Sequence, residues 1–171
     1  NGTINGQVYY SRIVPDSKQY YQFGLPLSCP LANVKMSNTD KLGGSQPKYG
    51  TAWMLKSYNE KKRANNGISN EGANWDLLPS NGTITAGRGY EMFSNSNYYR
   101  EFYFPITLLA EPTDTVSVSY TSNGAAGAAH AGWNILCSPY TGIYTVENYN
   151  DPATAIKVCW LQADGSYKQE Q

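Results

Sequence analysis

Several short stretches of this chain place an apolar residue at every second position, and this alternation limits the folds that the chain can adopt. In the segment YYQFGLPLSC, one face of an extended chain would carry Tyr21, Phe23, Leu25, Leu27 and Cys29. A period of two is the pattern of a β-strand with one buried face, whereas a helical pattern repeats every 3.6 residues. We therefore expect a fold built from strands.

The same reasoning predicts eight or nine strands along the chain. They lie at residues 2–14, 20–30, 51–59, 87–93, 100–106, 114–121, 132–139 and 155–161 and around Tyr167. Polar and Gly-rich composition predicts loops at 33–50, 59–74 and 123–131, and no helix is expected. Pro26 cannot donate a ladder hydrogen bond, so its segment should be an edge strand or a bulge. Short strands separated by Gly and Pro turns favour an all-β fold, a β-sandwich or jelly roll with long polar loops.

The composition agrees with this prediction and disfavours several partners. The chain has 15 Tyr and 16 Gly, residue types that favour pleated surfaces and turns respectively. Charged residues make up only 15% of the chain and the formal net charge is zero. This balance offers no basic footprint for nucleic acid or anionic lipid. No apolar run approaches the roughly 20 residues that a membrane helix needs, so membrane insertion is not expected.

The inward faces of the predicted strands supply a candidate core of large apolar side chains. Each contributes about 1.5–3 kcal/mol when fully buried, before conformational entropy is counted. The predicted core residues are Phe23, Leu25, Leu27, Trp53, Leu55, Phe102, Phe104, Trp133, Ile135, Val158 and Trp160.

The length fits one domain over residues 1–171. Within it, residues 1–122 and 123–171 form a possible pseudo-repeat whose second copy is incomplete. In both parts an aromatic strand ends at a proline, and a strand with a tryptophan follows and ends near a tyrosine, Tyr58 or Tyr167. The chain begins at Asn1 without a leader, as expected for a mature secreted protein or a piece of a larger one.

Three cysteines cannot all pair within the chain, and their spacing fits no metal-binding template. We expect Cys29, Cys137 and Cys159 to be buried free thiols. A disulfide between Cys29 and Cys137 is the alternative, and the separation of their Cα atoms would distinguish the two.

Catalytic arrangements find little support in the sequence. The single histidine, His130, lies in an Ala- and Gly-rich segment, and there is no Gly-x-Ser-x-Gly motif to expose a nucleophilic serine. Asp76 and Glu91 are the best candidates for a glycosidase pair, but both fit solvated strand or loop positions equally well. We therefore do not expect an enzyme.

Cofactor motifs are equally weak. The Gly87-Arg88-Gly89 segment lacks the third glycine and the following helix of a dinucleotide-binding turn, so close backbone approach or a bulge explains it better. The segments NYNDP (148–152) and QADGS (162–166) hold oxygen ligands without the spacing of a calcium loop. No cofactor is expected, and a structural calcium ion is the less favoured alternative.

The tyrosines are the more informative candidates for a binding site. Their number exceeds what so small a core can bury, and exposed rings with polar tips suit recognition. We select Tyr98, Tyr99, Arg100 and Tyr103 as a possible ligand-binding platform. The alternative is that tyrosines such as Tyr9 simply cover the outer faces of strands as cross-strand pairs.

A series of motifs spans nearly the whole chain in a defined order. The matching segments are Gly2 to Arg12, Phe23 to Pro30, Trp53 to Gly67, Ala86 to Tyr90, Phe102 to Phe104 and Gly132 to Tyr140. In this order they resemble a β-rich module of large surface and secreted proteins of Bacteroidetes, which often also carry adhesin-like regions or leucine-rich repeats. The resemblance implies an extracellular or cell-surface location with the signal peptide removed. It implies neighbouring domains of the same exported protein as partners, with a glycan or host surface as a further possibility, and it supplies no catalytic residues.

Together these observations predict a non-catalytic extracellular structural or adhesion module of a larger bacterial surface protein. The alternative is a carbohydrate-binding module that uses exposed tyrosines, for which a coplanar row of two or three rings flanked by amide side chains would be the structural signature.

Overall fold

The computed structural model describes residues 6–14, 18–37, 47–95, 101–106 and 116–137, and the backbone of 158–161 and 167–170. The chain divides into two compact units, Asn1–Thr141 and Gly142–Gln171. The second unit contains an antiparallel pair of strands, β10 (Val158–Leu161) and β11 (Tyr167–Glu170), which confirms both strands expected near this end. The pseudo-repeat stays a prediction.

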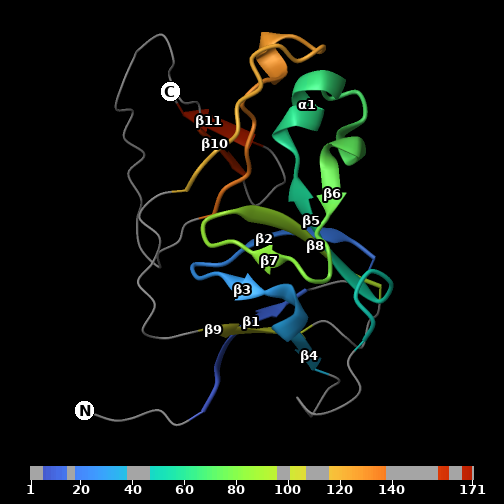
Figure 1. Ribbon diagram of the computed structural model, residues 1–171, viewed down its shortest axis with the longest axis vertical. Coiled ribbons are helices and arrows are strands. Elements are labelled where there is room, and N and C mark those ends of the chain that lie inside the picture. Colours follow the sequence, from blue (N-terminus) through green and yellow to red (C-terminus); the bar gives the residue numbers. More distant parts are fainter. Residues whose placement is uncertain are drawn as a thin grey trace, which may run out of the picture. The chain divides into compact units, whose positions relative to one another are not determined.

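The described part of the first unit contains three antiparallel sheets (Figure 1). One has the strand order β1 (Val8–Ile13), β9 (Glu101–Ile106) and β4 (Lys35–Ser37). The next has the order β2 (Tyr20–Gly24), β8 (Gly89–Ser94), β5 (Trp53–Tyr58) and β6 (Trp75–Leu77). The third pairs β3 (Cys29–Pro30) with β7 (Thr83–Ile84). The all-β prediction is confirmed, and the finer prediction of a sandwich or jelly roll stays a prediction.

Aromatic rings from the two larger sheets meet in one core. The ring of Phe23 on β2 stacks on that of Phe104 on β9, with centroids 4.6 Å apart. Trp53 on β5 contacts Phe102 on β9 edge-to-face at 5.3 Å. Alternation along β9 turns Phe102 and Phe104 inward and leaves Tyr103 on the opposite face. The period-two pattern of the sequence therefore corresponds to real burial at these positions.

Most of the predicted core residues that can be assessed are buried. Phe23, Leu25, Trp53, Leu55, Phe102 and Phe104 are all at most 6% exposed. Leu27 and Ile135 are half-buried. The prediction was wrong for Trp133, which is 41% exposed. The side chains of Val158 and Trp160 lie outside the described part of the structure.

The loop predicted over residues 59–74 is wrong, because it contains helix α1 (Glu60–Asn66) and a 3₁₀ turn, η2 (Glu71–Asn74). Asn59 caps α1, since its side-chain oxygen accepts a hydrogen bond of 3.0 Å from the backbone N–H of Lys62. Gly67 ends the helix with φ of 64°, a conformation that glycine adopts without strain. The helix was missed because it is too short to show a clear apolar period.

Two further corrections concern the segments next to the sheets. Residues 33–50 were expected to be a loop, but they include β4, and Leu31–Asn33 forms a 3₁₀ turn, η1. The single strand predicted over residues 20–30 is wrong, because β2 ends at Gly24, residues 25–28 lie outside any strand, and β3 begins at Cys29. β2 is an edge strand, as expected, but Pro26 lies beyond it.

The strands expected at 114–121 and 132–139 are also wrong within their described residues, which form a strap over 116–137 rather than sheet strands. A single bridge pairs Leu136 with Arg88, and the 3₁₀ turn η3 (Ala128–His130) lies between the two legs of the strap. Asn134 holds the legs together, because its amide bonds both the N–H and the C=O of Ser119. A side chain thus replaces the backbone pairing that alternation alone predicted.

Glycines on the sheet make room for this strap. A methyl group at Gly24 would overlap the side chain of Cys137, and one at Gly89 would overlap that of Ile135. These two glycines are cross-strand partners on β2 and β8. The N–H of Gly89 donates to the carbonyl of Ile135 at 2.8 Å, so backbone meets backbone here. The Gly-x-Gly segment therefore serves close approach, as expected.

A buried carboxylate attaches the strap to α1. Glu60 is 4% exposed and accepts hydrogen bonds from the N–H of Thr121 (2.9 Å), the hydroxyl of Thr121 (2.6 Å) and the N–H of Gly132 (2.8 Å). Burial raises the pKa of Glu60, but these hydrogen bonds outweigh burial, so its pKa lies below the ordinary value. The ionised form of Glu60 therefore stabilises the docked strap.

Truncating the central ring of the core should strongly destabilise the fold. We expect Phe102→Ala to lower the free energy of unfolding by about 3–5 kcal/mol, because the side chain is fully buried between the sheets. Urea unfolding followed by circular dichroism measures the change. The control is Ile13→Ala on β1, a side chain 61% exposed, whose effect should stay below about 1 kcal/mol. Equal effects of the two substitutions would contradict the proposed core.

The hydrogen bonds that the Glu60 carboxylate accepts from the strap predict that the stability of the fold depends on pH. Since the folded-state pKa is lowered, the stabilisation is present above the unfolded-state pKa and is lost as the pH falls through the folded-state value. Glu60→Gln should therefore cost about 1.5–3 kcal/mol at neutral pH, and this difference should shrink in acid. Urea midpoints measured across a pH series test this. Glu101→Gln is the control and should give a small difference without that trend.

Candidate functional site

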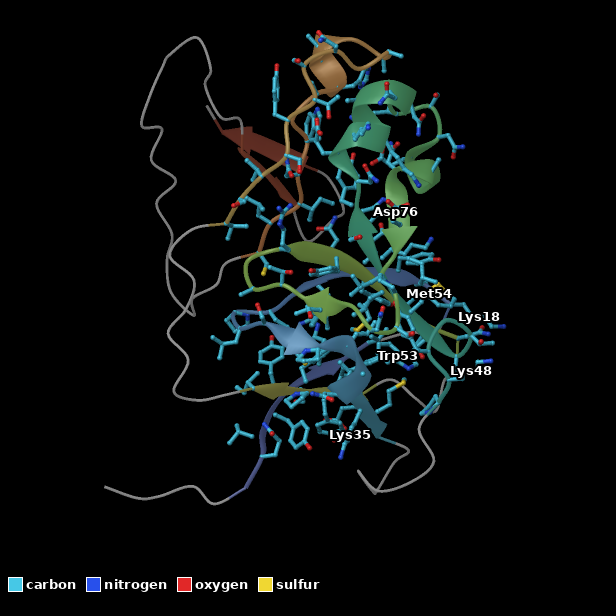
Figure 2. The ribbon with its side chains drawn as sticks, in the orientation of Figure 1. Lys18, Lys35, Lys48, Trp53, Met54 and Asp76 are labelled. Atoms are coloured by element: carbon cyan, nitrogen blue, oxygen red, sulfur yellow. The ribbon has the colours of Figure 1, made fainter. Side chains whose placement is uncertain are left out.

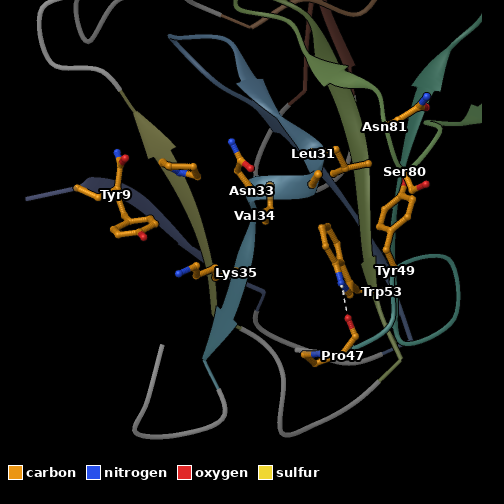
Figure 3. Close-up of a pocket in the computed structure, with 13 residues that line it drawn as sticks. Tyr9, Leu31, Asn33, Val34, Lys35, Pro47, Tyr49, Trp53, Ser80 and Asn81 are labelled. Carbon is orange, nitrogen blue, oxygen red and sulfur yellow. Dashed lines mark hydrogen bonds between the residues drawn. The ribbon is translucent and has the colours of Figure 1, made fainter. Parts of the chain in front are cut away.

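A cavity of about 730 Å³ opens beside η1 in the first unit (Figure 3). This volume lies in the range of small-molecule sites, roughly 300–1,000 Å³. Figure 3 shows Asn33 and Lys35 between Tyr9 on one side and Trp53 and Tyr49 on the other. The remaining lining residues are Gln7, Leu31, Ala32, Val34, Pro47, Ser80, Asn81 and Pro105. We call it the η1 cavity.

The base of the η1 cavity belongs to the hydrophobic core. Leu31, Val34 and Trp53 are each less than 9% exposed and line both the core and the cavity. The N–H of Leu31 donates to the carbonyl of Gly82 at 2.9 Å, which ties η1 to the turn before β7. Because these residues pack tightly in the core, the base of the cavity is fixed before any ligand arrives.

Tyr49 and Trp53 fix one wall of the cavity. The hydroxyl of Tyr49 donates to the carbonyl of Leu78 at 2.6 Å and accepts from the N–H of Leu55 at 3.3 Å. The indole N–H of Trp53 donates to the carbonyl of Pro47 at 3.2 Å, and the two rings meet edge-to-face at 4.8 Å. Burial raises the pKa of Tyr49 and outweighs the opposing hydrogen bond to Leu55, so its hydroxyl stays protonated at neutral pH. Both polar tips are thus used structurally, and the rings face the cavity.

The rim carries polar side chains that the fold leaves available. No residue of the described ranges bonds the side chains of Asn33, Ser80 or Asn81. Gln7, by contrast, donates to the carbonyls of Val8 (2.9 Å) and Ile106 (3.0 Å), and so closes the end of β1 against β9. The unbonded amide and hydroxyl groups can donate to or accept from a ligand without breaking a bond of the fold.

Tyr103 is the one predicted platform residue that the structure describes, and it adjoins this cavity. It is half-buried on β9 and faces Lys35 of β4 across the ladder. Its ring meets that of Tyr9 edge-to-face, with centroids 6.2 Å apart. Tyr98, Tyr99 and Arg100 lie outside the described residues. Tyr9 and Tyr103 are diagonal neighbours on adjacent strands, because their direct partners are Pro105 and Ser11. The choice between a platform and tiling stays a prediction.

The two carboxylates considered for catalysis occupy different settings. Asp76 accepts hydrogen bonds from the side chains of Asn59 and Lys62, which hold its pKa below the ordinary value. Figure 2 shows Asp76 toward the α1 end of the four-stranded sheet. Glu91 lies on the outer face of that sheet opposite Lys56, and burial raises its pKa although Lys56 opposes the shift. Asp76 is tied into the fold, which leaves no obvious acid–base role for it.

His130 lies at the end of η3 against Gly67, and its Nδ1 atom is buried without a partner among the described residues. Nearby on α1, the guanidinium of Arg63 bonds the carboxylate of Glu71 at 2.7 Å and lies over the ring of Trp133 at 5.3 Å. These contacts explain why Trp133 stands at the surface: its ring packs on an arginine instead of the core.

Cys29 and Cys137 are free thiols as expected, Cys29 buried and Cys137 only half-buried, and the alternative disulfide between them is not formed. The side chain of Cys159 lies outside the described part of the structure. Burial raises the pKa of Cys29 to about 11 and also raises that of Cys137. Within the described ranges no cluster of three or more His, Cys, Asp or Glu side chains could hold a metal ion. The two segments considered for calcium, 148–152 and 162–166, lie outside those ranges.

Comparisons with protein-family models, with curated proteins and with solved structures give no match for this chain. Among the described helices, none has both the length and the apolar character needed to span a membrane.

The sequence alone did not lead to the η1 cavity. Asn33 and Lys35 fall in the stretch expected to be a loop, and Ser80 and Asn81 belong to a turn about 50 residues later. The available signal was Tyr9, one of the tyrosines that the core could not accommodate. The pairing of β4 with β9 and the pairing of β3 with β7 bring these segments together.

We expect the hydroxyl of Tyr49 to make a measurable contribution to the stability of the fold. We expect Tyr49→Phe to lower the free energy of unfolding by about 1–3 kcal/mol, because it leaves the N–H of Leu55 and the carbonyl of Leu78 without this partner. Chemical denaturation measures the loss. Tyr120→Phe is the matched control, since that ring is 70% exposed, and it should leave stability nearly unchanged. A null effect at Tyr49 would mean that the hydroxyl does not hold this wall.

Proposed function

We propose that this chain is a non-catalytic structural or adhesion module of a larger exported bacterial protein, and that the η1 cavity is its recognition surface. The observation that carries the proposal is the lining of that cavity. Neutral amide and hydroxyl side chains that no described residue bonds stand beside aromatic rings on a fixed base. Such a surface suits recognition better than proton transfer, because no titratable pair among the described residues converges on it.

Three of the described carboxylates are used by the fold, which supports a non-catalytic role, whereas Glu91 keeps a pKa raised by burial. Glu60 holds the strap, Glu71 pairs with Arg63, and Asp76 is bonded by Asn59 and Lys62. General acid–base catalysis needs a carboxyl group that can reach a substrate with a suitable pKa. Carboxylates already occupied by several donors serve the fold instead.

The exported location is supported by the sequence resemblance and is compatible with the thiols. The buried thiol of Cys29, with its pKa near 11, holds very little of the reactive thiolate at neutral pH. A protein with such cysteines can leave them unpaired in an oxidising environment. Neighbouring domains of the same protein would be the partners of this module.

The narrower alternative is a carbohydrate-binding module that uses exposed tyrosines. The rings of Tyr9 and Tyr103 beside the cavity offer faces on which sugars stack, although their edge-to-face arrangement at 85° is not the coplanar row expected of such a module.

Adhesion is tested by measuring the binding of the purified chain to mucin-coated and fibronectin-coated surfaces. We expect saturable binding that Tyr9→Ala weakens at least about tenfold, whereas Tyr120→Ala, at an exposed site outside the cavity, has little effect. Binding should survive Asp76→Asn and Glu91→Gln. Turnover of either coating that those two substitutions abolish, or the absence of saturable binding to both coatings, would overturn the proposal.

A further inference from the structure

We infer that the η1 cavity binds an acidic saccharide, with Tyr9 and its neighbours contacting the sugar ring and Lys35 pairing with its carboxylate. This inference rests on the proposed adhesion function and names its ligand class. It rests on four side chains that lie next to one another on the outer face of the three-stranded sheet and on the polar side chains of the cavity rim. The four are those of Tyr9, Lys35, Tyr103 and Pro105.

The apolar part of the surface is formed by strands β1 and β9. Tyr9 and Pro105 are cross-strand partners, so their side chains lie next to each other on the outer face. Tyr103, two residues from Pro105 on the same face, sets its ring edge-to-face against that of Tyr9 at an interplanar angle of 85°. A sugar ring presents polarised C–H groups on one face, and these are attracted to the electron-rich face of an aromatic ring. The ring pair fixes the orientation of Tyr9 and so reduces the entropy lost on binding.

Hydroxyl groups of a sugar need donors and acceptors within reach. Asn33 on η1 and Ser80 and Asn81 on the turn before β7 line the same cavity, and no described residue bonds their side chains. An amide offers both a donor and an acceptor, as vicinal hydroxyl groups require. Figure 3 shows these side chains on both sides of the aromatic wall formed by Tyr49 and Trp53.

The charge of the site comes from Lys35. It is the one charged residue among the described residues that line the cavity, and it faces Tyr103 directly across the β4–β9 ladder. The described ion pairs join Lys62 to Asp76 and Arg63 to Glu71, so Lys35 forms none within those residues. Glu101 is on the same sheet face, opposite Ser37, and makes no ion pair with Lys35. An ammonium group without a partner, beside rings and amides, favours a carboxylate-bearing sugar over a neutral one.

Calorimetric titration with three probes tests the inference: an oligogalacturonate, which is acidic and a saccharide; maltohexaose, a neutral saccharide; and poly-L-glutamate, which is acidic without sugar rings. We expect the oligogalacturonate to bind best and its affinity to fall as salt is added. Lys35→Gln should weaken it about tenfold and bring it to the level of maltohexaose. Tyr9→Ala should weaken both saccharides.

Two matched control variants remove the same kinds of groups outside the cavity, so they show whether a loss of binding is specific to the cavity. Lys61→Gln removes an exposed ammonium on α1, and Tyr120→Ala removes an exposed ring on the strap. Neither should change oligogalacturonate binding. Asn33→Ala is a second variant of the cavity rim, and it should also weaken the binding of both saccharides. It replaces Tyr9→Ala in the test if circular dichroism shows that Tyr9→Ala does not fold.

Three results would overturn the inference. Equal affinity for maltohexaose and the oligogalacturonate would remove the role of the carboxylate. Equal affinity for poly-L-glutamate, unaffected by Tyr9→Ala, would show attraction by charge alone. Adhesion to fibronectin but not to mucin that depends on Tyr9, with no binding of either saccharide, would leave the adhesion function standing and reject the saccharide as its ligand.

Discussion

A column of aromatic rings between the two larger sheets is the interaction on which the first unit depends. Phe23 stacks on Phe104, Phe102 contacts Trp53, and Trp53 meets Tyr49, so the rings form a series from β2 to the wall of the η1 cavity. Aromatic pairs contribute about 0.5–1.5 kcal/mol each beyond the burial of their surface. The same residues therefore join the sheets and form a wall of the cavity. Because they are packed in the core, that wall is as rigid as the core.

The strap of residues 116–137 depends on different interactions. Glu60 fixes it at α1 through three hydrogen bonds, and the backbone of Gly89 and Gly87 fixes it at the sheet. Hydrogen bonds and close backbone contacts hold the strap in place, whereas the packing of apolar side chains holds the core together. This division explains why Val118, Tyr120 and Leu136 remain more than half exposed on a segment that is nevertheless held at several points.

The sequence predicted those parts of the fold whose burial follows a strict alternation. Strands β1, β2, β5, β8 and β9 contain the alternating segments, and their inward positions at Trp53, Leu55, Phe102 and Phe104 are buried as expected. The pattern at Val116, Val118 and Tyr120 misled because alternation reports only that a chain is extended, not that it finds a partner strand. The side-chain amide of Asn134 bonds the backbone N–H and C=O of Ser119. The local sequence around Ser119 contains no pattern that would predict this contact.

The candidate site was less predictable than the core. A cavity arises where segments distant in sequence meet, and the pairing of Lys35 with Tyr103 joins residues that no periodicity relates. The short helix α1 was hidden for a similar reason, because its stability comes from the cap at Asn59 and the tertiary bonds of Glu60 rather than from its own propensity.

The bare glycines under the strap carry a consequence for how this sequence can change over evolutionary time. Position 24 is in contact with position 137, position 89 with 135, and position 87 with 116, and no pair has room for an added methyl group. A larger residue at one member of a pair is tolerable only if its opposite member shrinks. The pairs 24–137 and 89–135 should therefore covary among relatives of the chain, whereas Gly87, with φ of 75°, is held as glycine by its backbone conformation as well.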